Sequence, residues 1–135
     1  MRTGNMERIL VIDDDVELCT LVGEYLQAEG LTVEAAHDGE SGLQRASGGG
    51  YLLVVLDVML PGINGFEVLR RIRSSERFHK LPVIVITSSD SLADRREGAN
   101  LGAAYFRKRP DYDEFLKVGG VIRHFLEEHG LLRGN

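Results

Sequence analysis

Five short strand-like runs, separated by segments with helical periodicity, constrain the fold of this chain more than any other feature of its sequence. Four of them are strongly apolar, at 9–12, 52–56, 83–86 and 103–106, and the fifth, at 32–36, is less apolar and alternates. An uninterrupted apolar run is typical of a strand that is covered on both faces, whereas alternation is typical of a strand at the edge of a sheet. The runs therefore predict a sheet that lies between two covering layers.

Helical patterns fill the intervals between the runs. Apolar side chains recur at helical spacing over 18–26, 66–72 and 115–129, and weaker patterns predict helices at about 39–47 and 90–100. Strand and helix thus alternate five times. This order predicts the α/β class, with a five-stranded parallel sheet, helices on both faces and right-handed crossover connections.

The length and composition of the chain fit a single globular domain. It has 135 residues, of which 43% are hydrophobic and 27% charged, within the usual range for a domain with one core. No apolar run approaches the roughly 18 residues of a membrane span, and the N-terminus lacks the pattern of a secretory signal. We therefore expect a cytoplasmic protein, in which residues 1–6 are a leader or an expression remnant, 7–129 form the domain, and 130–135 form a C-terminal tail.

Charge and thiol content argue against several other functions. Residues 1–67 carry 12 acids and 3 bases, whereas residues 68–135 carry 9 acids and 13 bases. No aromatic-studded basic stretch accompanies the positive residues, so we expect no nucleic-acid partner. Cys19 lies among apolar residues and is interpreted as a buried free thiol. The histidines lack ligand spacing and are interpreted as surface or helix residues; they are His37, His79, His124 and His129.

Polar side chains gather where the predicted strands end. In chain order they are Asp13, Asp14, Asp15, Asp57, Thr87, Ser88, Ser89, Arg107, Lys108 and Arg109. The carboxyl ends of parallel strands share one edge of the sheet, and open α/β sheets bind their ligands beyond that edge. We therefore expect these side chains to contribute to one site.

The carboxylates in this set imply a cation. Several of them within a few ångströms would repel strongly, and oxygen-only ligands suit a hard divalent ion such as Mg²⁺. A metal beside a carboxylate, a lysine and a hydroxyl suits phosphoryl transfer, with Asp57 as the nucleophile. Acidic residues at strand ends also cap helices, and capping is the preferred interpretation of Asp15 taken alone.

The chain resembles the receiver domains of bacterial response regulators over residues 7–129. The motifs that carry this resemblance are ILVIDDD at 9–15, LVVLDVMLPGINGFEVLRRIR at 53–73, LPVIVITSSDS at 81–91 and AYFRK at 104–108. The resemblance implies a flavodoxin-like, doubly wound (βα)5 fold with strand order 2-1-3-4-5.

The resemblance also implies a role for each residue of the site. Asp57 would be the phosphorylated residue, and Thr87 and Lys108 would contact the phosphoryl oxygens. Tyr105 would be the aromatic residue that rotates inward after Thr87. The groups that hold Mg²⁺ would be Asp14 directly, Asp13 through water, Asp57, and the backbone carbonyl of Met59.

One segment departs from the usual family pattern, which ends the fifth strand with Lys-Pro. This chain has Lys108-Arg109-Pro110 there. We favour placing Lys108 in the site, because this keeps the three-residue step from Tyr105 at the cost of one residue missing before the strand. The alternative keeps the proline and puts Arg109 in the lysine position with Phe106 as the switch aromatic. Arginine does not replace lysine equivalently in such a site.

The resemblance implies a signalling switch that is not an enzyme. A histidine kinase or a histidine phosphotransfer protein would phosphorylate Asp57. The change would alter a surface that binds an unknown downstream protein, or a second copy of the chain in a homodimer. Two alternatives stay open: a pseudo-receiver, which is a binding module that keeps the fold without switching, and a small phosphatase that forms an aspartyl phosphate.

Overall fold

Strands and helices alternate along the whole of the chain that the structure describes. The structure is a computed structural model, and it describes residues 7–88, 91–108 and 112–131. The elements in these ranges are, in chain order, β1 (Arg8–Ile12), α1 (Val16–Gln27), β2 (Thr32–Ala36), α2 (Gly39–Gly48), β3 (Tyr51–Asp57), α3 (Gly65–Ser74), β4 (Val83–Thr87), α4 (Leu92–Asn100), β5 (Ala104–Arg107) and α5 (Tyr112–Glu128). The predicted leader at 1–6 lies outside the described residues, as do Ser89 and Arg109.

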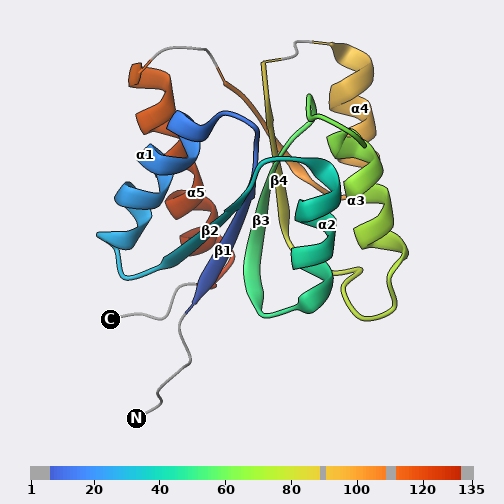
Figure 1. Ribbon diagram of the computed structural model, residues 1–135, viewed down its shortest axis with the longest axis horizontal. Coiled ribbons are helices and arrows are strands. Elements are labelled where there is room, and N and C mark those ends of the chain that lie inside the picture. The colour runs from blue at the N-terminus through green and yellow to red at the C-terminus, as the bar shows by residue number, and fades with distance from the viewer. Residues whose placement is uncertain (1–6, 89–90, 109–111, 132–135) are drawn as a thin grey trace.

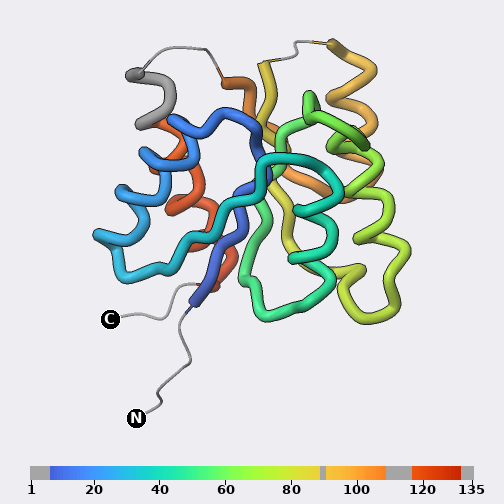
Figure 2. The backbone as a smooth tube through the Cα atoms, viewed as in Figure 1, coloured from blue at the N-terminus to red at the C-terminus, as the bar shows by residue number. Residues whose placement is uncertain are grey.

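The strands form one parallel sheet in the order β2-β1-β3-β4-β5. In Figures 1 and 2, α1 and α5 cover one face of the sheet, and α2, α3 and α4 cover the other. This arrangement confirms the predicted α/β class, the strand order and the helices on both faces. The alternating run forms β2, which lies at one edge of the sheet as predicted, and β5 lies at the other edge.

Apolar side chains form one cluster on each face of the sheet. In β1, Ile9 and Val11 belong to the cluster under α1 and α5, whereas Leu10 and Ile12 belong to the cluster under α2 and α3. All four side chains are fully buried. A strand covered on both faces has no solvent-facing position, which explains why the apolar runs of β1, β3 and β4 contain no polar side chain.

The residues that precede four of the helices define where those helices begin. Asp15, Asp38, Asn64 and Ser91 are the N-cap residues of α1, α2, α3 and α4, and each accepts a hydrogen bond from a backbone N–H in the first turn. The Asp15 carboxylate accepts from the Leu18 N–H at 3.1 Å. Capping is therefore the role that the structure gives Asp15.

Three strands run one residue beyond the predicted apolar segments, through Asp57, Thr87 and Arg107. Parallel pairing continues to these positions, since Asp57 pairs with Ile86 and Thr87 pairs with Arg107. A polar residue at the end of a buried strand breaks the apolar pattern without breaking the backbone ladder. The last helix also begins earlier than its apolar periodicity predicts, at Tyr112.

Gly65, the first residue of α3, sets how closely this helix approaches the end of β3. A Cβ atom at this position would clash with the Asp57 carbonyl oxygen and lie 2.8 Å from the Val58 Cα. Both are backbone atoms, so the helix would have to move. We predict that Gly65→Ala lowers the free energy of unfolding by about 2–4 kcal/mol, measured by urea denaturation.

Gly48→Ala is the matched control for this substitution. Nothing lies within 4 Å of a Cβ atom built on Gly48, at the end of α2. We expect its free energy of unfolding to change by no more than about 0.5 kcal/mol. Equal losses in the two variants would contradict the argument from close approach at Gly65.

Candidate functional site

Three carboxylates converge at the carboxyl ends of the neighbouring strands β1 and β3. The register pairs Ile12 with Leu56, so the next residues, Asp13 and Asp57, leave the two strands at the same level. In Figures 1 and 2, the segments after β1 and β3 lie at the upper edge of the sheet. Carboxylate oxygens of Asp13, Asp14 and Asp57 all lie within 4.8 Å of one another. Asp13 and Asp57 are buried, with 0% and 4% exposure, whereas Asp14 is exposed.

Lys108 brings a positive charge to the two buried carboxylates. Its Nζ lies 2.7 Å from Asp13 Oδ2 and 3.4 Å from Asp57 Oδ2. The residue follows β5 directly, and its backbone N–H donates to the Thr87 carbonyl at the end of β4 with a distance of 2.9 Å. The pairing of β4 with β5 thus places Lys108 at the same edge of the sheet as the aspartates. There, its one ammonium group pairs with two buried carboxylates.

Burial has the largest effect on the titration of these groups. It raises the pKa of Asp57 to about 6, and the charge of Asp13 adds to this shift. Burial also raises the pKa of Asp13. For Lys108, burial acts to lower the pKa, but Asp13 and Asp57 together outweigh it and raise the pKa above its usual value. Lys108 therefore stays charged, and Asp13 and Asp57 ionise at a higher pH than ordinary aspartates, mainly because burial leaves their charges poorly solvated.

The carboxylate cluster fits a hard divalent cation. Its donors are all carboxylate oxygens, and Mg²⁺ binds carboxylates together with carbonyl oxygens and water. The raised pKa values of Asp13 and Asp57 indicate an environment that a dication would compensate. The chemistry of this donor set therefore matches the expected magnesium ion, with Asp13, Asp14 and Asp57 able to hold it.

Thr87 and Met59 lie in the segments next to the carboxylates. Thr87 is fully buried at the end of β4, the strand beside β3, and its carbonyl oxygen holds the Lys108 backbone. The backbone N–H of Met59 donates to Asp57 Oδ1 at 3.2 Å. The Met59 side chain is 65% exposed. Met59 therefore contacts Asp57 through its backbone N–H, and its side chain faces solvent.

The two aromatic residues of β5 lie on opposite faces of the sheet. Tyr105 packs against the cluster under α2 and α3, and the Arg95 guanidinium of α4 lies 5.1 Å from its ring centre. Phe106 packs against the cluster under α1 and α5. Lys108 contacts the two buried carboxylates, as the favoured register expects. Arg109 lies outside the described residues, so the choice of Tyr105 over Phe106 as the switch aromatic stays a prediction.

Sequence reasoning missed two side chains that contact the backbone of the site. The Asp13 carbonyl oxygen lies 2.9 Å from His37 Nδ1 and 3.5 Å from Cys19 Sγ. His37 lies 24 residues from Asp13 along the chain, and no spacing in the sequence marks the pair. Cys19 is a buried free thiol, as predicted. Burial raises the pKa of this thiol to about 12, which keeps it protonated and unreactive at neutral pH.

Comparison with known proteins identifies the family. The family model of the response regulator receiver domain matches residues 9–118, and the chain belongs to this family of two-component signalling proteins. It is 39% identical over 123 residues to the uncharacterised transcriptional regulatory protein YkoG of Bacillus subtilis, covering 90% of this chain and 52% of that protein. It is also 39% identical over 127 residues to the transcriptional regulatory protein CpxR of Escherichia coli K12, covering 91% and 53%. The chain thus spans about half the length of these relatives.

Solved structures share the fold. A CheY-like response regulator receiver domain protein from Methanospirillum hungatei matches with a TM-score of 0.78 and 27% identity, covering 91% of this chain and 95% of that chain. The response regulator TrrA from Thermotoga maritima, solved in complex with Mg(2+)-BeF, matches with a TM-score of 0.72 and 30% identity, covering 90% and 100%. Receiver domains of this family are phosphoacceptor switches rather than true enzymes, and they bind Mg²⁺ at an aspartate cluster.

Two further expectations concern the C-terminal boundary of the domain and the presence of membrane-spanning helices. The family match ends at 118, so the domain boundary at 129 stays a prediction. Within the described ranges, no helix combines the length and the apolar character that crossing a bilayer requires.

We predict that Asp57→Asn raises the free energy of unfolding of the metal-free protein by about 1–2 kcal/mol at pH 7.5, because it removes a buried charge beside Asp13. The folded-state pKa of Asp57, about 6, lies above its unfolded value, so ionisation of Asp57 costs stability as the pH rises through this range. The gain from asparagine should therefore be full above about pH 6 and vanish below about pH 4. Urea denaturation in EDTA from pH 4 to pH 8 measures it.

Asp38→Asn serves as the control for this pH dependence. The hydrogen bond from the Ser41 backbone lowers the pKa of Asp38, so its charge does not destabilise the fold and asparagine should bring no gain at pH 7.5. A gain for Asp57→Asn that persists at pH 4, or an equal gain for Asp38→Asn, would contradict the assignment of the effect to the buried charge of Asp57.

Proposed function

We propose that this chain is a phosphoryl-accepting receiver whose Asp57 is phosphorylated in a Mg²⁺-dependent reaction. The observation that carries the proposal is a buried carboxylate with Lys108 Nζ 3.4 Å from its Oδ2 and two further aspartates within 4.8 Å. The complex of the relative TrrA with Mg(2+)-BeF supports the choice of metal. The donor is a histidine kinase or a histidine phosphotransfer protein, and the reaction takes place in the cytoplasm.

Asp57 acts as the nucleophile in this proposal. One of its carboxylate oxygens attacks the phosphorus of a phosphohistidine, so that a P–O bond forms while the P–N bond breaks and its electron pair leaves with the imidazole nitrogen. A pKa of about 6 leaves the carboxylate largely ionised at neutral pH. The Met59 N–H on Oδ1 and the Lys108 ammonium on Oδ2 orient the group for attack.

The neighbouring groups hold the transferred phosphoryl group. Lys108 pairs with one of its oxygens, and the Thr87 hydroxyl donates a hydrogen bond to another. When bound, Mg²⁺ supplies positive charge that offsets the carboxylates and the phosphoryl oxygens. The groups that would hold the ion are the side chains of Asp13, Asp14 and Asp57 and the Met59 carbonyl.

The output of the switch is a change at α4 and β5. Phosphorylation adds charge and acceptor oxygens near Thr87, which favours a new hydroxyl position and an inward rotation of Tyr105. Gly98 is the one buried residue of α4, so this helix has little apolar packing to lose when it shifts. The changed surface binds a downstream protein or a second copy of the chain.

The two alternative functions find less support in the geometry. A phosphatase that forms an aspartyl phosphate needs its nucleophile on the first strand. The match of residues 9–118 to the receiver family model instead favours a phosphoacceptor switch over such an enzyme. A pseudo-receiver that has lost its lysine is at odds with the position of Lys108.

Incubation with Mg²⁺ and acetyl phosphate, followed by intact-protein mass spectrometry, tests the proposal directly. We expect one labile phosphate adduct in the parent chain, because acetyl phosphate can supply the phosphoryl group to a carboxylate that is already oriented. The adduct should be absent in Asp57→Asn and in the presence of EDTA. An adduct that survives in Asp57→Asn, or none in a parent chain shown separately to bind Mg²⁺, would refute it.

The lysine assignment has its own test. We predict that Lys108→Met slows phosphorylation by acetyl phosphate at least about tenfold, because it removes the cation that pairs with the phosphoryl oxygens. A urea denaturation curve for Lys108→Met shows whether the loss reflects the missing charge or unfolding. Arg109→Met is the matched control and should stay close to the parental rate. The reverse pattern, with Arg109→Met slow and Lys108→Met unaffected, would select the alternative register.

A further inference from the structure

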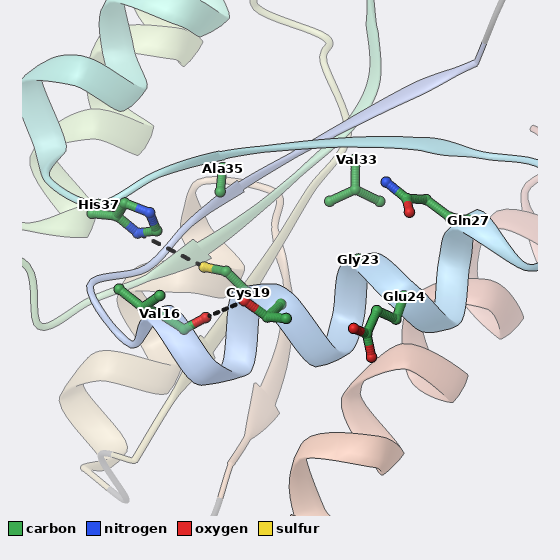
Figure 3. Close-up of a pocket in the computed structure, with 9 residues that line it drawn as sticks. Val16, Cys19, Gly23, Glu24, Gln27, Val33, Ala35 and His37 are labelled. Atoms are coloured by element: carbon green, nitrogen blue, oxygen red, sulfur yellow. Dashed lines mark hydrogen bonds between the residues drawn. The ribbon is translucent and has the colours of Figure 1, made fainter.

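His37 reaches the acidic loop from the segment that follows β2. Its Nδ1 lies 2.9 Å from the Asp13 carbonyl oxygen and 4.0 Å from Cys19 Sγ. Figure 3 shows the imidazole and the thiol pointing toward one another at one end of a groove between α1 and β2, whose volume is about 280 Å³. The ring thus stands against the loop that carries Asp13 and Asp14.

The backbone on both sides of His37 is anchored. The Ala36 carbonyl accepts a hydrogen bond from the Asp13 N–H at 2.9 Å. On the other side, Asp38 caps α2 by accepting from the Ser41 N–H at 2.8 Å. Because the backbone is held on both sides, the hydrogen bond to the Asp13 carbonyl has to order only the side-chain torsions of His37.

The carbonyl that His37 contacts belongs to the peptide group that joins Asp13 to Asp14. The orientation of this peptide group sets the direction in which Asp14 leaves the backbone. Asp14 is exposed, yet its carboxylate lies within 4.8 Å of the buried carboxylates of Asp13 and Asp57. Like charges at this separation repel, so the backbone has to hold Asp14 beside the other two.

We propose that His37 is a positioning residue for the cation site: by donating to the Asp13 carbonyl, it holds the peptide that directs Asp14 toward Asp57. This inference rests on the proposed Mg²⁺ site and adds a residue that touches neither the ion nor the phosphoryl group. A carbonyl oxygen only accepts hydrogen bonds, so the neutral ring carries its proton on Nδ1.

Isothermal titration calorimetry with Mg²⁺ alone, at pH 7.5, tests the role of this donor. His37→Leu removes the N–H and keeps a side chain of similar reach, and we expect its Mg²⁺ dissociation constant to rise about three- to tenfold. His37→Asn places an amide N–H at the same δ position and should restore the constant to within about twofold. His79→Leu is the matched control, because His79 Nδ1 also lies 3.1 Å from a carbonyl, that of Glu76, in the loop between α3 and β4.

The outcomes separate this inference from its alternatives. Recovery in His37→Asn, with no change in His79→Leu, supports it. Equal weakening in His37→Asn or in His79→Leu would overturn it, because the donor at His37 would not be the cause. A lower unfolding temperature of His37→Leu in EDTA with an unchanged dissociation constant would also overturn it, since the role would then be structural alone. Nitrogen NMR at pH 8 that finds the neutral ring protonated on Nε2 would do the same.

Failure of this inference differs visibly from failure of the proposed function. A parent chain that binds no Mg²⁺ overturns the proposed function and takes this inference with it. A parent chain that binds Mg²⁺ and gains the phosphate adduct, while His37→Leu binds Mg²⁺ equally well, overturns the role of His37 and leaves the proposed function intact.

Discussion

The register between β1 and β3 is the constraint on which the site depends. Because Ile12 pairs with Leu56, Asp13 and Asp57 lie side by side at the ends of two neighbouring strands. Burial strengthens the repulsion between their charges. The two apolar clusters hold that register, because a slip of one residue would exchange the faces to which Ile9 and Leu10 belong. Apolar burial on both faces therefore offsets an arrangement of charges that is unfavourable on its own, as is common where a fold carries a functional site.

The groups of the site come from the ends of the four neighbouring strands β1, β3, β4 and β5, so the sheet positions them all. Asp57 ends β3, Thr87 ends β4, and Lys108 follows β5 with its N–H bonded to the Thr87 carbonyl. The contact of His37 with the Asp13 carbonyl adds β2 to the same edge. Residues at strand ends are held in position by the hydrogen bonds between the strands. Residues on long loops would need additional contacts to be held as precisely.

The α/β class and the gathering of the acidic residues at one edge of the sheet were predictable from short-range sequence patterns, whereas the strand order was predicted only through the family resemblance. Strands that are buried on both faces are continuously apolar, so β1, β3 and β4 can be recognised in the sequence. In a parallel sheet, the polar residues that follow such strands lie at the same edge. Two features of the site could not be predicted from the sequence. The lysine register was ambiguous because Lys108 and Arg109 are adjacent, and it is the pairing of β4 with β5 that aims the Lys108 ammonium at Asp13. The contact of His37 depends on two loops meeting, which no periodicity encodes.

The two ends of α4 are attached to the domain in different ways, and this bears on how a charge change at Asp57 reaches the surface. Arg73 of α3 donates to the Leu101 carbonyl at 2.6 Å and to the Leu81 carbonyl at 2.7 Å, tying the C-terminal end of α4 to the loop before β4. At the N-terminal end, Leu92 is 61% exposed. The exposed Leu92 therefore has little apolar area to lose if this end of α4 is displaced. In the proposed switch, a phosphoryl group on Asp57 that favours one arrangement of α4 by a few kcal/mol would be enough to shift the population between the two arrangements.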